Sequence, residues 1–205
     1  MSQTSARAAT DRKAELLAVL ARTAIGERSA PVSLRQFAIR AGVSEPTLRH
    51  YFTDRQGVVI AIIDYFAEGA RDWLTRSAEP HADVGEAVAG YASLAAEGVD
   101  SDLFAQAHAF ALVESIHDPV VAEAYRELII EPSLDAIERR LKPGVDPAGS
   151  APERVRHAAL ALYSPILIAV LHQRLLRGAD ARPLDIGTFS SDLRRLFESG
   201  FRNSR

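Results

Sequence analysis

The sequence contains no cysteine and no long apolar segment. The first absence excludes a disulfide framework and a thiolate metal site. The longest nearly uncharged apolar run spans fourteen residues, from Ala158 to Leu171, whereas a transmembrane helix needs about 20. The amino-terminal residues, MSQTSARAATDRKAELL, are polar and of mixed charge, unlike a signal peptide. We therefore expect a cytoplasmic protein that does not interact with a membrane.

Motifs that carry enzyme chemistry are also missing from the sequence. It has no Gly-x-Ser-x-Gly, phosphate loop, His-Glu-x-x-His or glycine-rich dinucleotide turn. The six histidines are scattered, and His108 and Glu114 are six positions apart, so they do not share a helix face. His117 and Asp118 end a helix just before Pro119, which favours helix capping over catalysis. We expect no enzyme activity, no metal site and no cofactor.

Strand-like alternation is nearly absent, and apolar residues recur at helical spacing along the chain. Apolar residues make up 47% of the sequence and charged residues 25%, which is ordinary for a globular protein with a sizeable core. The pattern predicts an all-α fold of about nine helices. They span roughly residues 10–25, 33–41, 44–52, 53–78, 84–97, 102–117, 119–141, 152–177 and 186–201. Pro132 should kink or interrupt its helix.

The net charge of −3 conceals an asymmetry along the chain. Residues 1–56 hold nine basic and five acidic residues, a net charge of +4. Residues 57–205 hold fifteen and twenty-two, a net charge of −7. A basic amino-terminal quarter on an acidic body suggests an anionic partner for that quarter, although a solvated charge distribution has the same signature.

The segment AGVSEPTLRHYFTDR, residues 41–55, predicts a short helix after a tight turn. Gly42 permits the positive φ of a helix end, Ser44 is a good N-cap residue, and Pro46 suits a first helical turn. Upstream, Ser33 and Gln36 have capping-box spacing. Two short helices joined by a glycine turn are the physical content of a helix-turn-helix. The alternative reading is a plain corner between core helices.

A second capping-box spacing, Thr53 and Gln56, should open a long fourth helix that reaches about Ala78. With Leu48 and Phe52 facing inward, the outer face of the preceding short helix is free to enter a DNA major groove. Arginine can read guanine there, and hydroxyl, imidazole and cationic groups can bind phosphates. The candidate DNA-binding residues are Ser33, Ser44, Glu45, Pro46, Thr47, Arg49, His50, Tyr51 and Arg55.

These residues resemble the TetR family of bacterial transcriptional regulators, whose members show a pattern like AGVSxxTLYxYFxxK before a long fourth helix. Residues 41–44, 47–48 and 51–52 match that pattern, and SLRQFAIR matches the second helix of the family in placement. The resemblance covers roughly residues 10–66. Arg49 stands where the family usually has tyrosine and adds a potential guanine reader. Arg55 stands where the family usually has lysine and keeps a cation for phosphate.

The resemblance implies a helix-turn-helix DNA-binding domain at residues 1–56 and a helical ligand-binding and dimerisation domain at residues 57–205. It implies a regulator, expected to be a repressor, that binds double-stranded operator DNA as a homodimer and is released by a small molecule. We expect this ligand to be largely apolar, because the candidate pocket residues named below are mostly aromatic. The alternative is an all-helical enzyme or small-molecule binding protein with an incidental helix-turn-helix.

Aromatic and histidine residues of the middle helices are the candidates for a ligand pocket, which combines apolar walls with a few polar groups. They are Trp73, Phe104, His108, Phe110, Tyr125, Tyr163 and His172. A helix that is apolar all round, at 158–171, and an apolar stripe on the last helix suggest a dimer interface; a plain core helix is the alternative. The interface candidates are Ala158, Ala161, Ala169, Leu193, Leu196 and Phe197.

Overall fold

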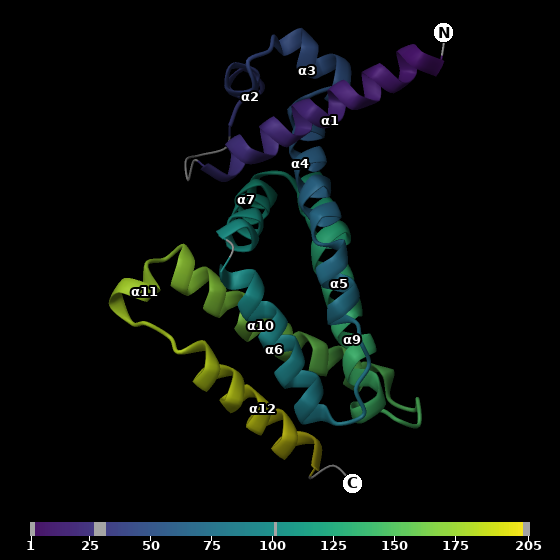
Figure 1. Ribbon diagram of the computed structural model, residues 1–205, viewed down its shortest axis with the longest axis vertical. Coiled ribbons are helices and arrows are strands. Elements are labelled where there is room, and N and C mark those ends of the chain that lie inside the picture. The colour runs from purple at the N-terminus through teal and green to yellow at the C-terminus, as the bar shows by residue number, and fades with distance from the viewer. Residues whose placement is uncertain (1–2, 27–31, 101, 203–205) are drawn as a thin grey trace. The chain divides into compact units, whose positions relative to one another are not determined.

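The computed structural model describes residues 3–26, 32–100 and 102–202 of the chain. Within these ranges the chain forms α-helices and one π-helical segment, with no strand, so the all-α prediction is confirmed (Figure 1). The α-helices are α1 Gln3–Gly26, α2 Leu34–Ala41, α3 Glu45–Phe52, α4 Arg55–Gly69, α5 Arg71–Ser77, α6 Val84–Asp100, α7 Asp102–His117, α8 Pro119–Tyr125, α9 Glu131–Val145, α10 Pro152–Arg174, α11 Gly178–Ala181 and α12 Ile186–Arg202.

The chain divides into two compact units. Unit 1 consists of Met1–Gly69 and Ala107–Ile129, and unit 2 of Ala70–Gln106 and Ile130–Arg205. Unit 1 therefore holds α1 to α4, most of α7, and α8. Apolar residues at helical spacing turn one side of each amino-terminal helix inward. The buried residues of α1 to α4 include Leu16, Leu20, Phe37, Leu48, Phe52, Val58, Ile62, Ile63 and Phe66.

The long fourth helix expected from the sequence is divided in two. α4 ends at Gly69 and α5 begins at Arg71, which puts Trp73 on α5. Glycine is a poor helix former, and Ala70 adopts φ −93° and ψ 0°, a turn conformation. The boundary between the two units falls at this break.

A second predicted helix, 119–141, is also interrupted. It comprises α8, a π-helical segment at Arg126–Ile130, and α9, with Pro132 in the first turn of α9. Proline lacks an N–H donor and its ring clashes with the carbonyl four residues earlier, and a wider π turn accommodates both. The interruption at Pro132 is thus confirmed. Because of these two divisions and the short α11, the described ranges contain more helices than the nine expected.

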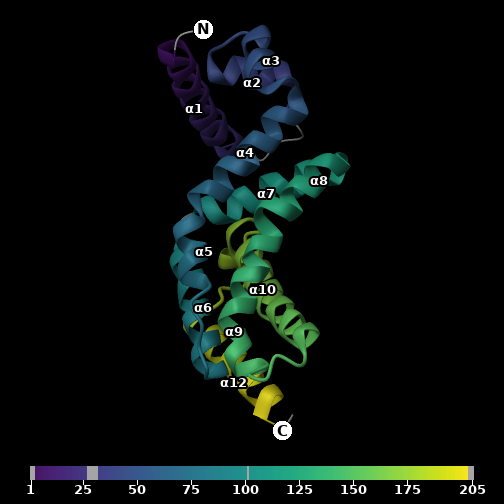
Figure 2. The same ribbon diagram turned by 90° about the vertical axis from the view of Figure 1, so that its right-hand side faces the viewer.

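Unit 2 packs α5, α6, α9, α10 and α12 around one apolar core. Within it, α12 lies along α6, and α10 lies along α9 (Figures 1 and 2). The largest fully buried side chains here are Tyr91, Leu134, Ile137, Leu141 and Leu162. Leu193 and Phe197 join the same core from α12.

A buried arginine, Arg140 of α9, binds the end of α5 and the start of α6. Only 3% of Arg140 is exposed. Its Nε donates to the carbonyl of Ala87 at 2.7 Å, and its Nη1 donates to the carbonyl of Arg76 at 3.1 Å. Gly90 makes room for the guanidinium, because a Cβ at that position would collide with Nη2. Burial lowers the pKa of Arg140 below its usual value.

Candidate nucleic-acid interface

The caps predicted around the helix-turn-helix are confirmed. The Oγ of Ser33 accepts from the amide of Gln36 at 3.2 Å, and the amide of Ser33 donates to Oε1 of Gln36 at 2.9 Å, which completes a capping box. Gly42 has φ 66° at the end of α2. Ser44 caps α3 by accepting from the amide of Thr47 at 3.2 Å, and Pro46 lies in the first turn. The two helices are therefore fixed at both sides of the turn by local hydrogen bonds.

The short helix α3 presents the outer face expected of a recognition helix. Leu48 and Phe52 are buried, while Pro46, Arg49 and His50 are exposed. Glu45, Thr47 and Tyr51 are half-buried, and the ring of Tyr51 lies edge-on to that of His50 with centroids 4.9 Å apart. The Oγ atoms of Ser44 and Thr47 lie 2.8 Å apart, so these hydroxyls are engaged in the cap.

The junction between α3 and α4 differs from the predicted capping box. Thr53 has φ 69° and ψ −58°, and the amide of Asp54 donates to the carbonyl of Phe52 at 2.8 Å, which is a γ-turn. Asp54 caps α4 instead of Thr53, since its Oδ1 accepts from the amide of Gly57 at 2.8 Å. Gly57 is required here because a Cβ would collide with the carbonyl of Phe52. The second capping box was therefore predicted wrongly.

Arg55, predicted to bind DNA phosphate, has two partners inside unit 1. Its Nε donates to the carbonyl of Val32 at 2.7 Å. Its Nη2 donates to both carboxylate oxygens of Glu114, at 2.9 Å and 2.7 Å. A phosphate contact by Arg55 would have to compete with both. The pairing of Arg55 with Glu114 was not predicted, because no local sequence pattern links two residues that are 59 positions apart.

The neighbouring residue Gln56 makes a second contact between α4 and the start of α8. Its Nε2 donates to both oxygens of Asp118, at 3.0 Å and 2.8 Å. Asp118 also accepts from the amides of Val120 and Val121, so its predicted capping role is confirmed. The hydrogen bond from Gln56, followed by those amides, lowers the pKa of Asp118.

The seven candidate ligand residues divide between the two units. In unit 2, the Nε1 of Trp73 donates to the carbonyl of Leu94 at 3.1 Å, and its ring lies 6.1 Å from that of Phe104. Tyr163 lies in the core of unit 2, where burial raises its pKa well above the usual value, and His172 is exposed.

In unit 1, His108 and Tyr125 form a buried hydrogen-bonded pair, and the ring of Phe110 packs edge-on to that of Phe66. The structure thus brings together Trp73 with Phe104, and His108 with Tyr125. The assignment of all seven residues to a ligand remains a prediction.

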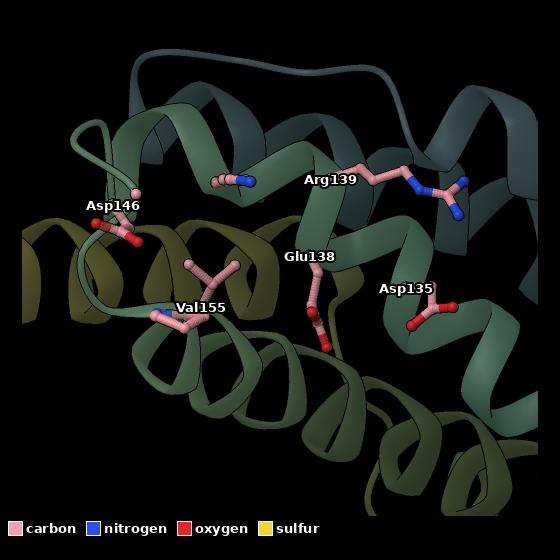
Figure 3. Close-up of a pocket in the computed structure, with 8 residues that line it drawn as sticks. Asp135, Glu138, Arg139, Asp146 and Val155 are labelled. Atoms are coloured by element: carbon pink, nitrogen blue, oxygen red, sulfur yellow. The ribbon is translucent and has the colours of Figure 1, made fainter.

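Two pockets in unit 2 are lined by none of these seven residues. One is a depression between α9 and the loop before α10 that is lined mainly by charged residues, and Glu138 and Asp146 lie on different sides of it (Figure 3). Glu138 is held by Nη1 of Arg156 at 2.9 Å, and Asp146 accepts from two loop amides. The other is an apolar cleft between α6, α10 and α12, which includes Ala169. Among the described residues, no group of three or more His, Asp or Glu side chains could hold a metal ion.

The six candidate interface residues differ in exposure. Ala158, Leu193 and Phe197 are buried by their own chain, so they offer little surface to a partner. Ala161 and Leu196 are exposed, as are Leu160 and Ile168, which were not among the predicted interface residues. The available surface on α10 is therefore a stripe of Leu160, Ala161, Ser164 and Ile168.

Helix α10 is also the one described helix that is long and apolar enough to cross a membrane, judged by length and composition alone. Only 39% of its most apolar window is buried inside the structure. Its inner side, which includes Val155, Ala159, Leu162 and Ile166, belongs to the core of unit 2. The helix therefore has one face in the core and a second apolar face that the described part of the chain leaves exposed.

Solved structures with a similar arrangement of helices include those of two regulatory proteins. One is the fatty acid degradation regulator FadR from Bacillus halodurans, which is 16% identical, has a TM-score of 0.63, and aligns over 93% of this chain and 96% of that chain. Another is the TetR family repressor AlkX from Dietzia sp., implicated in biodegradation of n-alkanes, at 17% identity, a TM-score of 0.50, and coverage of 93% and 95%. No family model and no curated protein matches the sequence. The chain therefore has the all-helical fold of TetR-type transcriptional regulators.

Proposed function

We propose that this protein is a DNA-binding transcriptional regulator, acting as a repressor in the cytoplasm. The observation that carries the proposal is α3: a short helix, capped by Ser44 and packed through Leu48 and Phe52, with Arg49 and His50 exposed on its outer face. A helix of this kind can enter the major groove, where an arginine binds the O6 and N7 atoms of guanine.

The charge distribution supports the same function. The net charge of +4 within residues 1–56 favours association with DNA phosphates, while the acidic remainder of the chain does not compete for them. In addition, the amino-terminal end of α3 presents helix amides at the side of Ser44, a geometry that suits a phosphate oxygen. Arg49 and His50 would then read bases or bind the backbone next to that anchor.

A homodimer would place two such helices on the two halves of an operator. The uncovered apolar face of α10, with Leu160 and Ile168, is the surface we assign to the partner, with Leu196 of α12 as a further exposed apolar residue. A symmetric pair of these helices would bury both stripes against each other, which is the usual solution for an exposed apolar face. Two recognition helices must then lie about one DNA turn apart, about 34–36 Å.

The ligand that releases the repressor is proposed to be small and largely apolar. Within unit 2, Phe104 and Leu175 pack against the buried Val170, and the ring of Phe104 lies 6.1 Å from that of Trp73. Close to Phe104 in sequence, Oε1 of Gln106 is buried without a hydrogen bond among the described residues. An apolar molecule with one polar donor would suit such surroundings. The two similar structures are named for fatty acid degradation and n-alkane biodegradation, which points to the same chemical class.

The alternative is an enzyme or binding protein in which the helix-turn-helix has no DNA partner. Retardation of a labelled fragment from upstream of the coding sequence, in the presence of excess unrelated DNA, separates the two. Specific retardation that long-chain acyl compounds reverse supports a ligand-released repressor. A protein that retards neither this fragment nor any member of a random DNA library contradicts the proposed function.

A further inference from the structure

The two ends of the helix-turn-helix are joined by one side chain. Val32 comes just before α2, and Arg55 is the first residue of α4, directly after α3 and its turn. The Nε of Arg55 donates to the carbonyl of Val32 at 2.7 Å across 23 residues of sequence. This hydrogen bond ties the residue before α2 to the first residue of α4, the helix that follows α3. The orientation of the Arg55 side chain therefore helps to fix the position of α3 relative to α2 and α4.

Glu114 of α7 fixes the direction of that side chain. Both of its oxygens accept from Nη2 of Arg55, and only 3% of the Glu114 side chain is exposed, against 30% for Arg55. A buried carboxylate is stable only when it is paired, and removal of either partner leaves an unpaired charge behind. Glu114 therefore holds Arg55 in the orientation in which its Nε reaches Val32.

A parallel contact lies one residue further along α4. Gln56 donates to Asp118, four positions after Glu114, at the start of α8. Two consecutive residues of α4 are thus bound to two carboxylates at the junction of α7 and α8. A displacement of this junction would pull on both residues together.

The backbone between α3 and these contacts is strained. Thr53, a β-branched residue, has φ 69°, a conformation that such residues avoid and that persists only when the surroundings impose it. Arg55 and Gln56, which are bound to Glu114 and Asp118, follow Thr53 by two and three positions. Release of the contacts would allow Thr53 to relax and α3 to change direction.

We propose that Glu114 is a positioning residue for DNA recognition, which sets the orientation of α3 through Arg55 and thereby couples the α7–α8 junction to operator binding. The inference rests on the proposed function. It also gives Arg55 a role other than the phosphate contact expected from the sequence. A ligand or partner that moves α7 would act on α3 by this route.

The test compares Glu114→Gln with Glu123→Gln, an exposed glutamate on α8, in the full-length protein. Glu114→Gln keeps the shape but replaces one acceptor oxygen by an amide donor facing Arg55. Amide hydrogen exchange of residues 44–58 in the absence of DNA reports the position of α3 without any need for function. We expect faster exchange there in Glu114→Gln, and unchanged exchange in Glu123→Gln.

Operator affinity, measured at several salt concentrations, supplies the second readout. We expect Glu114→Gln to weaken binding about tenfold, within the range of coupling between sites, with an unchanged salt slope. Arg55→Lys keeps the charge but cannot reach Val32 and Glu114 together, so it should weaken binding similarly. The double variant Arg55→Ala/Glu114→Ala should lose no more operator affinity than the single variant with the larger loss, because both changes break the same contact.

The results that overturn the inference are distinct from those that overturn the proposed function. Unchanged exchange at residues 44–58 in Glu114→Gln shows that Glu114 does not position α3. If the losses of operator affinity in Arg55→Ala and Glu114→Ala add up in the double variant, the two residues act independently. If, in addition, the dependence of affinity on salt concentration falls by about one unit in Arg55→Ala only, Arg55 contacts a DNA phosphate instead. If amide exchange at residues 44–58 is faster in Glu114→Gln but the wild-type protein binds no DNA, Glu114 still positions α3. Its role in operator binding is then contradicted together with the proposed function.

Discussion

The Nδ1 atom of His108 lies 2.6 Å from the hydroxyl of Tyr125, and this buried hydrogen bond joins α7 to α8 within unit 1. Burial disfavours the charged imidazolium and lowers the pKa of His108 to about 4, from an ordinary value of 6.5. The neutral ring and the phenol hydroxyl then satisfy each other inside the helix pair. Protonation of His108 would place a charge in that interior.

This pair predicts a loss of stability on mild acidification. Because the pKa of His108 is lower in the folded than in the unfolded state, the unfolded chain binds more protons between pH 4 and pH 6.5. The stability is fully present above pH 6.5 and falls by up to about 3 kcal/mol as the pH approaches 4. Thermal unfolding of the wild type and His108→Gln across this window measures it. Parallel pH profiles for the two proteins would show that His108 is not the titrating group.

Thr53→Gly is expected to stabilise the protein. Positive φ in a non-glycine residue costs about 1–3 kcal/mol, and glycine relieves this strain. Glycine also loses more conformational entropy on folding, which costs about 0.5–1 kcal/mol. The net gain should be about 1 kcal/mol, observed as a rise in the unfolding temperature of a few degrees. Thr75→Gly on α5, an ordinary helical position, is the control and should lower the unfolding temperature. A fall for both variants would mean that Thr53 is not strained.

Gly90 and Arg140 should be energetically coupled. Gly90→Ala alone should destabilise the protein, because its Cβ would displace a guanidinium that three carbonyl groups and His81 surround. In an Arg140→Met background the same change should be neutral or favourable, since alanine is the better helix former. A double-mutant cycle by chemical denaturation should give a coupling energy of about 1–3 kcal/mol. A coupling energy near zero would place the guanidinium elsewhere.

The proposed dimer depends on the outer face of α10. Ile168→Glu should convert a dimer into a monomer with unchanged helical content, because a charge cannot be buried against an apolar stripe. Leu176→Glu is the matched control, since Leu176 is equally apolar and exposed but lies beyond α10. Light scattering distinguishes the two states. A wild-type monomer at micromolar concentration would contradict the dimer, and an unaffected Ile168→Glu dimer would move the interface to another surface such as that of Leu196.

Features that depend on neighbouring residues could be predicted from the sequence. The capping box at Ser33, the turn at Gly42 and the cap at Ser44 each arise within four positions. The start of α4 was missed because Thr53 and Asp54 are both good capping residues, and the choice between them depends on how closely Gly57 approaches Phe52.

Features that depend on distant residues could not be predicted. The partners Arg55 and Glu114 are 59 positions apart, and no periodicity connects them. On α12, helical spacing identified an apolar stripe but did not separate the buried Leu193 and Phe197 from the exposed Leu196. That distinction depends on which side of α12 faces α6, a property of the packed unit rather than of the helix alone.

The most direct test of the account is the base-by-base DNA affinity of Arg49→Ala, measured on operators selected from random DNA by the wild-type protein. The account predicts that the variant loses about 1–3 kcal/mol on the best sequence, and that the preference for one base pair in each half-site disappears while the others persist. Arg126→Ala, which removes an exposed arginine far from α3 in sequence, should keep the wild-type affinity and preferences. An Arg49→Ala protein that keeps every base preference, or that binds the selected operators as tightly as the wild type, would contradict the assignment of α3 as the recognition helix.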